Sequence, residues 1–270
     1  MGAAEGSQGL IVNNWTSPLE ERTNSPDPSS ADLITASGIE SSARTDKTYI
    51  ATFDFDFNRG TGIVGVWPEA SSCSGVITFR SADSAGVASG DLTINKPTGT
   101  VQDDVMIASI GVRPETATIN APTGWALVKR IDNTNTTANS LAVYYKVAGA
   151  SEPASYTWTI PSHTGAAGGI QSFSGGNTTN PIDVEDGQTT AYGLSHATPS
   201  VVTTVTDTML VTSHTFSSPT TWTPPAHMTE RFDVLGGNQA IEGNYVLQAA
   251  AGPTGTKTAY ASTDDDVGNL

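Results

Sequence analysis

The chain has 270 residues with 27 acidic and 12 basic side chains, and its formal net charge of -15 at pH 7 argues against nucleic acid and anionic membrane surfaces as partners. No apolar run has the length of a membrane-spanning helix, and a single cysteine, Cys73, excludes an intramolecular disulfide. Only 14% of the residues are charged, and Thr, Ser, Ala, Gly and Val are frequent, so the composition favours many short strands joined by polar turns.

Residues 1–48 are predicted to form an extended N-terminal arm. Between Asn13 and Lys47 there are three prolines among polar residues, and no apolar periodicity is sustained. Apolar anchors on a polar arm usually dock on another surface, although an ordinary terminus packed on its own domain has the same composition. The candidate anchors of such an assembly arm are Leu10, Ile11, Val12 and Trp15.

Residues 49–75 are predicted to be strands that link the arm to the main domain. From Tyr49 to Phe57, aromatic side chains alternate with Thr and Asp as in a half-buried strand. Gly60 to Gly65 matches a dinucleotide-binding fingerprint, but strand residues and Pro68 follow where the mechanism needs a helix. Asp54 to Gly60 resembles the first half of a calcium loop, but the twelfth position has no carboxylate. Neither motif is predicted to bind a ligand.

Residues 76–270 are predicted to form an antiparallel β-sandwich, with jelly-roll connectivity as the favoured form and helix as a minor component. Short apolar runs alternate with turns rich in Gly and Pro, such as Lys96–Gly99 and Ala121–Gly124. The run Val105–Ile110 is apolar on both faces, which indicates a central strand covered on both sides. The expected strands of this all-β domain are Val76–Phe79, Leu92–Ile94, Val105–Val112, Leu127–Ile131, Ser140–Val147, Tyr156–Ile160, Gly169–Phe173, Ser200–Val205, Met209–His214, Ala240–Leu247 and Lys257–Ala261.

The residues that carry chemistry form no recognisable catalytic or metal site in the sequence. There is no Gly-x-Ser-x-Gly motif, although a Ser-His-Asp triad assembled from distant residues stays an alternative. The acidic groups in residues 183–186 and 264–266 fit either a surface cation or, in the favoured interpretation, a solvated turn. We predict no catalytic residue, no metal and no cofactor. The histidines stand alone, without partners at ligand spacing: they are His163, His196, His214 and His227.

Two tryptophans beside turns, Trp125 and Trp222, are the candidate ligand-binding aromatic residues. Exposed indoles at the rims of loops stack on sugar rings. Tryptophans that close the ends of a sandwich core have the same sequence context, and the core role is favoured because an indole brings a large apolar area and one hydrogen-bond donor.

The order of motifs from Val76 onward resembles a group of β-sandwich domains in tailed-phage and prophage structural proteins and in some bacterial surface proteins. These motifs are turns, strand centres and core residues, so the resemblance implies an architecture and a non-enzymatic module displayed on a particle or surface. It carries no catalytic residue over to this chain. The motifs are Phe79–Ala82, Lys96–Thr100, Asp104–Ala108, Ala121–Trp125, Leu141–Ala148, Ser151–Tyr156 and Asn180–Asp183.

The function expected from these features is that of a phage virion structural protein, either a capsid decoration or a tail or fibre component. Its expected partners are copies of itself, for example in a trimer, capsid or tail proteins, and surface glycans, with no nucleic acid and no membrane insertion. The expected location is the virion surface, because the first residues lack the features of a secretory signal; a secreted or cell-surface location is the alternative. A glycan-binding adhesin or carbohydrate-binding module is the second hypothesis, and a hydrolase is the third.

Overall fold

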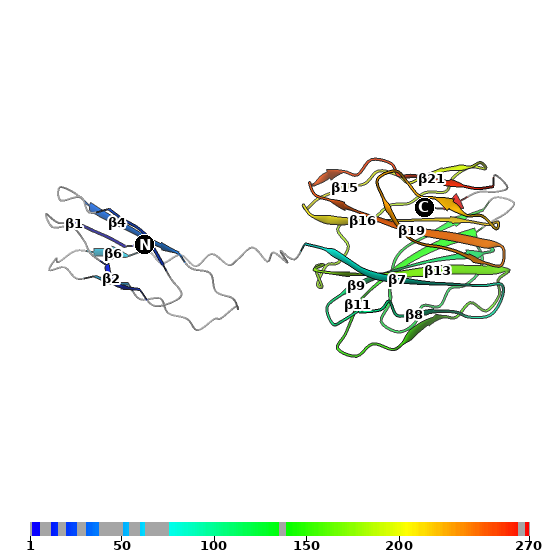
Figure 1. Cartoon of the computed structure of the whole chain (residues 1–270), viewed down its shortest axis with the longest axis horizontal. Helices are drawn as coiled ribbons and strands as arrows, with labels where there is room; N and C mark the ends of the chain where they lie inside the picture. The colour runs from blue at the N-terminus through cyan, green and yellow to red at the C-terminus, as the bar shows by residue number, and fades with distance from the viewer. Residues whose placement is uncertain are drawn as a thin grey trace. The chain divides into compact units, whose positions relative to one another are not determined.

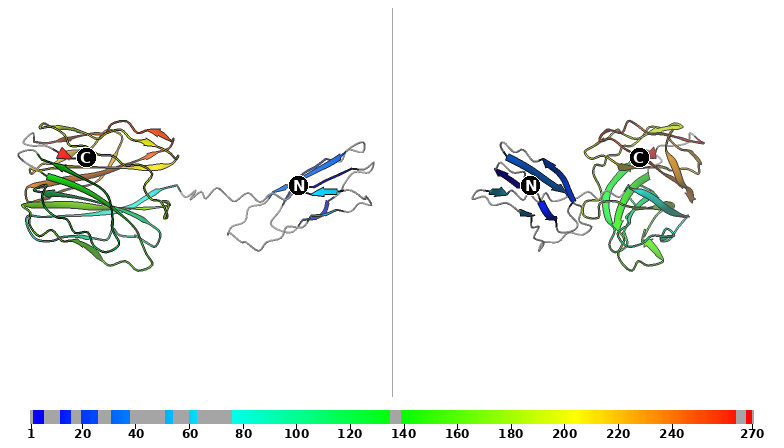
Figure 2. Two further views of the ribbon diagram at one scale, coloured as in Figure 1. Left: turned by 180° about the vertical axis from the view of Figure 1, so that it is seen from behind. Right: turned by 60° about the vertical axis from the view of Figure 1, so that its left-hand side comes forward.

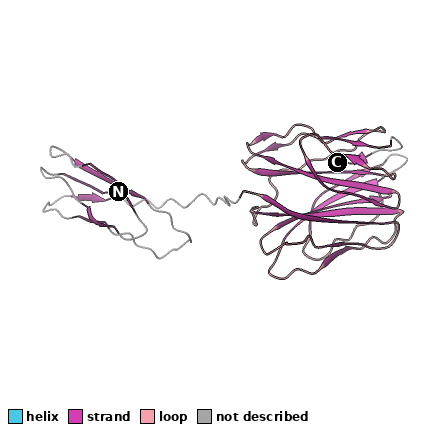
Figure 3. Ribbon diagram, in the orientation of Figure 1, coloured by secondary structure: helices cyan, strands magenta, loops and turns pink. Residues whose placement is uncertain are grey.

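The structure is a computed structural model in which the chain divides into two compact units, residues 1–71 and 72–270, each described here by itself. It describes residues 76–134 and 139–263 with their side chains, together with the backbone of β22 and of six strands in the first unit. All the regular structure in the described residues is strand (Figure 3). The prediction of an all-β fold is confirmed.

The first unit contains six short strands. Four of them form an antiparallel sheet in the order β3-β4-β1-β6, and β2 pairs with β5. Their bounds are β1 (Gly2–Glu5), β2 (Val12–Trp15), β3 (Glu20–Ser25), β4 (Ala31–Ser37), β5 (Ala51–Phe53) and β6 (Gly60–Gly62).

The extended arm predicted for residues 1–48 is not confirmed, because β1 to β4 fall within it. Val12 and Trp15 of the predicted assembly arm lie at the two ends of β2, whereas Leu10 and Ile11 lie outside the described residues. The docking role of these residues stays a prediction, as do the domain boundaries placed after residues 48 and 75.

The second unit is built on two main antiparallel sheets, ordered β10-β11-β9-β13-β7 and β18-β19-β16-β22. Smaller sheets pair β8 with β12, β15 with β20, and β21 with both β14 and β17. The strands of the first main sheet and its small neighbour are β7 (Thr78–Val87), β8 (Leu92–Asn95), β9 (Val105–Arg113), β10 (Ala126–Asn133), β11 (Asn139–Val147), β12 (Ser155–Trp158) and β13 (Gly165–Ser174). The later strands are β14 (Ser195–Ala197), β15 (Val202–Thr203), β16 (Thr208–Phe216), β17 (Trp222–Thr223), β18 (Thr229–Gly236), β19 (Gln239–Gln248), β20 (Gly252–Pro253), β21 (Thr258–Ala261) and β22 (Gly268–Asn269).

The two main sheets stack face to face, and each carries a small sheet on its outer face (Figures 1 and 2). β9 lies at the centre of the first sheet and is buried from Val105 to Val112, as its two apolar faces predicted. The β-sandwich is therefore confirmed, whereas the jelly-roll connectivity is not.

Two consecutive parts of this unit repeat one strand topology. In the first part the sheet order is β10-β11-β9-β13, and in the second the corresponding strands stand in the order β18-β19-β16-β22. The small sheets correspond as well, since β8 pairs with β12 and β14 pairs with β21. Turns match in detail: Trp125 N–H donates to the Pro122 carbonyl (3.2 Å), and Met228 N–H donates to the Pro225 carbonyl (3.1 Å). We call these parts the first and second repeats.

Equivalent residues of the two repeats meet where the main sheets face each other. Ser109 on β9 and Ser213 on β16 place their hydroxyl oxygens 2.6 Å apart. Leu141 on β11 and Ile241 on β19 belong to one buried apolar cluster. The second unit therefore contains two copies of one strand topology that pack face to face, with equivalent residues in contact.

Apolar side chains pack in each of the three spaces between the layers. The largest cluster lies between the first main sheet and β8–β12 and contains Leu92, Ile110 and Trp158. Between the main sheets, the ring of Phe232 fits against two glycines that face it, Gly169 and Gly243. A side chain on either glycine would occupy the space of the ring, so these glycines set the distance between the sheets.

Candidate functional site

Trp125 and Trp222 are core residues, which corrects the glycan-stacking hypothesis for both. Their exposed fractions are only 8% and 7%. The Trp125 ring packs against Tyr156 and Trp158, with ring centroids 5.1 and 5.4 Å away. Trp222 packs against Phe216 at 5.9 Å in the second outer layer. Neither indole face is free for a sugar, so the core role favoured by the sequence is correct.

The sequence suggested that all four histidines stand alone, but His214 has a close acidic partner. His214 on β16 and Glu242 on β19 are direct cross-strand partners, and both are completely buried. Nδ1 of His214 lies 2.7 Å from Oε1 of Glu242. Asn244 and His196 are also fully buried in this second repeat. We call His196, His214, Glu230, Glu242 and Asn244 the buried polar cluster.

Burial shifts the pKa of two members of this cluster, Glu230 and His196. It raises the pKa of Glu230 to about 7, with a further contribution from the neighbouring Glu242 carboxylate. It lowers the pKa of His196 to about 4, and repulsion from His214 adds to that effect. Burial also raises the pKa of Asp233, whose carboxylate accepts a hydrogen bond from the Trp222 backbone N–H (2.9 Å).

The His214–Glu242 pair has the geometry of a general base held by a carboxylate, but it is sealed from solvent. Trp222 and the sheet β14-β21-β17 cover it, and the His214 and Trp222 ring centroids are 5.8 Å apart. A substrate has no route to a pair with no exposed surface. Among the described residues, no group of three or more His, Cys, Asp and Glu side chains is arranged to hold a metal ion. The cluster is best explained as part of the core.

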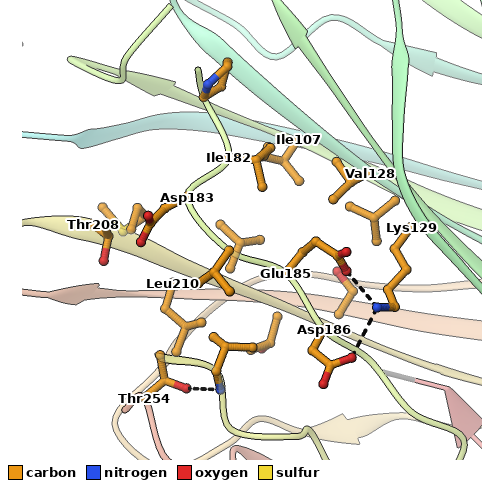
Figure 4. Close-up of a pocket in the computed structure, with 18 of the residues that line it drawn as sticks. Ile107, Val128, Lys129, Ile182, Asp183, Glu185, Asp186, Thr208, Leu210 and Thr254 are labelled. Carbon is orange, nitrogen blue, oxygen red and sulfur yellow. Dashed lines mark hydrogen bonds and ion pairs between the residues drawn. The ribbon is translucent and has the colours of Figure 1, made fainter. Parts of the chain in front are cut away.

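The main cavity of interest lies between the two repeats and has a volume of about 240 Å³. Figure 4 shows the segment that contains Ile182, Asp183, Glu185 and Asp186 running between the strand of Lys129 and the strand of Leu210. Most of the lining is apolar and comes from facing positions of both main sheets. Its central apolar residues are Val105, Ile107, Leu141, Val143, Met209 and Val211.

The acidic group in residues 183–186 covers this pocket and binds groups of the protein itself. The Lys129 ammonium group lies 2.9 Å from Glu185 and 3.2 Å from Asp186. Asp183 accepts hydrogen bonds from the backbone N–H (2.8 Å) and the hydroxyl group of Thr204. The favoured interpretation of a solvated turn is therefore incomplete, because the three carboxylates tie the segment over the pocket.

One side of β16 is open beside this pocket. β22 pairs with β16 only at Thr215 and Phe216. In the part of the chain that the structure describes, no strand pairs with this side of β16 from Thr208 to His214. The pocket is lined by consecutive residues of β16, whose side chains alternate between the two faces of the sheet, as expected beside a strand edge. We call the stretch of this edge from Thr208 to Val211, together with the pocket, the β16 slot.

Sequence reasoning missed both the buried polar cluster and the β16 slot. A signal for the cluster exists, because His214 and Glu242 each interrupt an apolar strand pattern, and a charged residue there needs a partner. The slot has no local signal. It depends on the pairing of segments far apart in the chain.

Comparisons with known proteins give no relative from which a function can be transferred. No family model, no curated protein and no solved structure matches this chain significantly. The resemblance to phage and bacterial surface domains therefore stays a prediction. In the described residues, no helix has the length and apolar character needed to cross a membrane.

Proposed function

We propose that this chain is a non-enzymatic structural protein of a phage virion, a capsid decoration or a tail or fibre component, which acts by self-assembly and by binding neighbouring virion proteins. The observation that supports this proposal is the edge of β16 from Thr208 to Val211, where no strand of the described residues pairs on the side away from β19 and an apolar pocket lies beside it. An unpaired strand edge offers backbone hydrogen bonds to another chain, and it is a liability unless something covers it.

The burial of the chemistry-bearing groups favours assembly over catalysis. His214 and Glu242 have no exposed surface, and the carboxylates of residues 183–186 are tied to the protein itself. The virion surface is the proposed location, and a secreted or cell-surface location is the alternative. The proposed partners are copies of the same chain and capsid or tail proteins.

The oligomeric state tests the proposal. The full chain is expected to sediment as a discrete oligomer across a concentration series, and electron microscopy should show symmetric particles. A chain that remains monomeric at every concentration would contradict self-assembly.

A variant that lacks residues 1–71 tests the predicted docking role of the first unit. Because these residues form a separate unit, the remaining chain should keep its strand-rich circular dichroism spectrum. A smaller oligomer is expected if the first unit docks on a neighbour. An oligomer of unchanged size would show that the first unit does not take part in the contact between subunits.

Glycan binding is the second candidate function, and Tyr260 on β21 favours it. This residue is 51% exposed on the outer face of its sheet, and its register partners on the two sides are Ser195 and Thr223. An exposed aromatic ring between hydroxyl groups is a common way to bind a sugar. Glycan-array binding that disappears in Tyr260→Ala and persists in Val202→Ala would support it. Val202 is also exposed but lies on β15.

A further inference from the structure

The sequence contains one Asp-Gly pair, Asp186–Gly187, and no Asn-Gly pair. An aspartate followed by glycine can close a five-membered imide ring, in which the glycine nitrogen bonds to the side-chain carboxyl carbon of the aspartate. Glycine favours this ring because it has no side chain to hinder the approach and because its backbone adopts unusual conformations at little cost. Whether the ring forms depends on how the folded backbone holds the two groups.

The backbone around Asp186 leaves room for ring closure. Asp186 and Gly187 lie in the segment between β13 and β14 and belong to no strand, and the Asp186 side chain is 50% exposed. By contrast, Asp83 and the small residue that follows it, Ser84, both lie in β7 and have register partners on β13. Because a strand ladder fixes the backbone around Asp83, ring closure is hindered there and not at Asp186.

The reacting groups of Asp186 and Gly187 already face each other. The backbone N–H of Gly187 donates a hydrogen bond to Oδ1 of Asp186, with nitrogen and oxygen 2.8 Å apart. The nitrogen that attacks therefore lies on the same side of the chain as the carboxyl group that it attacks. Such proximity favours an intramolecular reaction, because little further ordering is needed before the bond forms.

Lys129 on β10 opposes the reaction. Its ammonium group lies 3.2 Å from Oδ1 of Asp186 and 2.9 Å from Oε2 of Glu185. The hydrogen bond from Gly187 and the ion pair with Lys129 both lower the pKa of the Asp186 carboxyl group. Ring closure expels the carboxyl OH group as water, and an ionised carboxylate has no OH group to lose. Lys129 therefore keeps Asp186 in its less reactive form.

We propose that Asp186 is a site of spontaneous isomerisation and that its ion pair with Lys129 sets the rate. In the first step, the Gly187 nitrogen bonds to Cγ of Asp186, and the carboxyl OH leaves with the N–H proton as one molecule of water. In the second step, one molecule of water adds to the main-chain carbonyl carbon of Asp186, and the bond from that carbon to the Gly187 nitrogen breaks. The main chain then runs through Cβ and Cγ, without an oxidant and without a net change in mass. This proposal is independent of the proposed function.

Isomerisation changes how the segment of residues 183–186 is tied over the pocket. Glu185 and Asp186 hold one end through Lys129, and Asp183 holds the other through Thr204. An isoaspartate lengthens the main chain by one carbon and places its carboxylate on a shorter branch, so the contact with Lys129 is disturbed while the contact of Asp183 stays. The segment should therefore be held less tightly in molecules that have isomerised.

A protease that cleaves before aspartate but not before isoaspartate measures the reaction. The full chain is aged in solution in its folded state, then unfolded and digested. Cleavage before Asp183, Asp186 and Asp207 gives the peptides 183–185 and 186–206, whereas an isomerised chain gives the single peptide 183–206. This longer peptide should accumulate with time. Its absence from the aged chain overturns the proposal.

Two variants test the role of Lys129. Lys129→Met should speed the accumulation at neutral pH by about threefold, in line with the modest strength of an exposed ion pair. This difference should vanish at a pH low enough to protonate the carboxyl group in both chains. Lys257→Met, the matched control, removes a charge next to β21 and should leave the rate unchanged. Equal rates for Lys129→Met and the unchanged chain overturn the role of Lys129.

Salt provides a second measurement on the unchanged chain, which decides if Lys129→Met fails to fold. High salt weakens an exposed ion pair, so it should speed isomerisation. A rate that does not depend on salt then overturns the role of Lys129.

Hydrogen exchange compares the two forms within one aged sample. Peptides that contain Asp186 have the same mass in both forms but separate by chromatography. The backbone amides of the isomerised form should exchange faster, because its contact with Lys129 is disturbed. Equal exchange in the two forms contradicts the loosening of the segment.

Discussion

At the scale of single residues, the buried polar cluster makes stability depend on pH. Glu230 has a pKa of about 7 in the folded chain against 4.5 for an ordinary glutamate, because burial and the Glu242 carboxylate both disfavour its charge. Between these values the folded state holds a proton that the unfolded state has lost. The contribution of Glu230 therefore makes the chain less stable as pH rises from about 4.5 to about 7.

Glu230→Gln is expected to remove this loss, because a glutamine stays neutral at every pH. Relative to the unchanged chain, the variant should gain stability between pH 5 and pH 8, which the midpoints of urea unfolding at the two pH values measure. If the urea midpoint changes between pH 5 and pH 8 by the same amount in the variant and in the unchanged chain, the raised pKa of Glu230 is contradicted.

His196→Gln is the matched comparison, with the opposite sign. The folded pKa of His196 is about 4 against 6.5, so its contribution to stability is present above pH 6.5 and is lost as pH falls towards 4. In the His196→Gln variant, the free energy of unfolding should therefore fall less than in the unchanged chain as pH is lowered from 6.5 towards 4. His196 also packs against Phe216 and Trp222, so only the slope of stability against pH is compared between variants.

At the scale of elements, the contact between the main sheets depends on small residues that face a ring. Gly169→Ala on β13 would put a methyl group into the space of the Phe232 ring on β18. Such overpacking typically costs about 1–3 kcal/mol of unfolding free energy. The effect should shrink in a background with Phe232→Leu, as a double-mutant cycle by chemical denaturation would show.

Gly149→Ala is the control for this prediction. Its new methyl group would have only an ordinary contact, 3.6 Å from Oε1 of Glu152. A change below about 0.5 kcal/mol is expected at such a position. Equal losses for Gly149→Ala and Gly169→Ala would show that the ring does not set the sheet distance.

The strands that the sequence predicts well are those with an uninterrupted apolar pattern. β8, β9 and β11 were expected almost at their observed bounds. β18 was missed, because Glu230, Arg231 and Asp233 hide its pattern, and two of these side chains turn towards the buried polar cluster. β7 extends to Val87 through small and polar residues without a clear period. The local order of apolar and polar residues thus predicts only those strands in which each face is uniformly apolar or uniformly polar.

The candidate site could not be predicted from the local pattern of apolar and polar residues. The two tryptophans were found as important residues, but their burial depends on the outer layers that cover them. The pairing of His214 with Glu242 and the pairing of β22 with β16 follow from contacts between distant segments. A single sequence gives no register for such contacts.

At the scale of the whole molecule, the two repeats depend on each other. The inner face of each main sheet contributes apolar residues to the space between them, among them Leu141, Phe173 and Ile241. A fragment of residues 76–180 would leave the inner face of the first repeat uncovered, and large exposed apolar patches cause association. Light scattering after size-exclusion chromatography should therefore show dimers or aggregates, whereas a stable monomeric fragment would contradict this dependence.

The repeat itself was not predicted, although its signals are present. Pro122 and Pro225 begin matching turns, and Asp103 and Asp207 both adopt positive φ angles of 68° and 57° before a central strand. Side chains at other matching places have diverged: the core residue Trp158 corresponds to Ala261. Similar backbones with different side chains are difficult to align without the structure.

The contact between Ser109 and Ser213 resembles a contact between subunits. A residue that meets its own equivalent across a two-fold axis is the signature of an isologous interface, the kind that joins identical subunits. The second unit thus has, within one chain, the form of a homodimer. A change at such a position acts on both sides of the contact, as it does at the axis of a symmetric dimer.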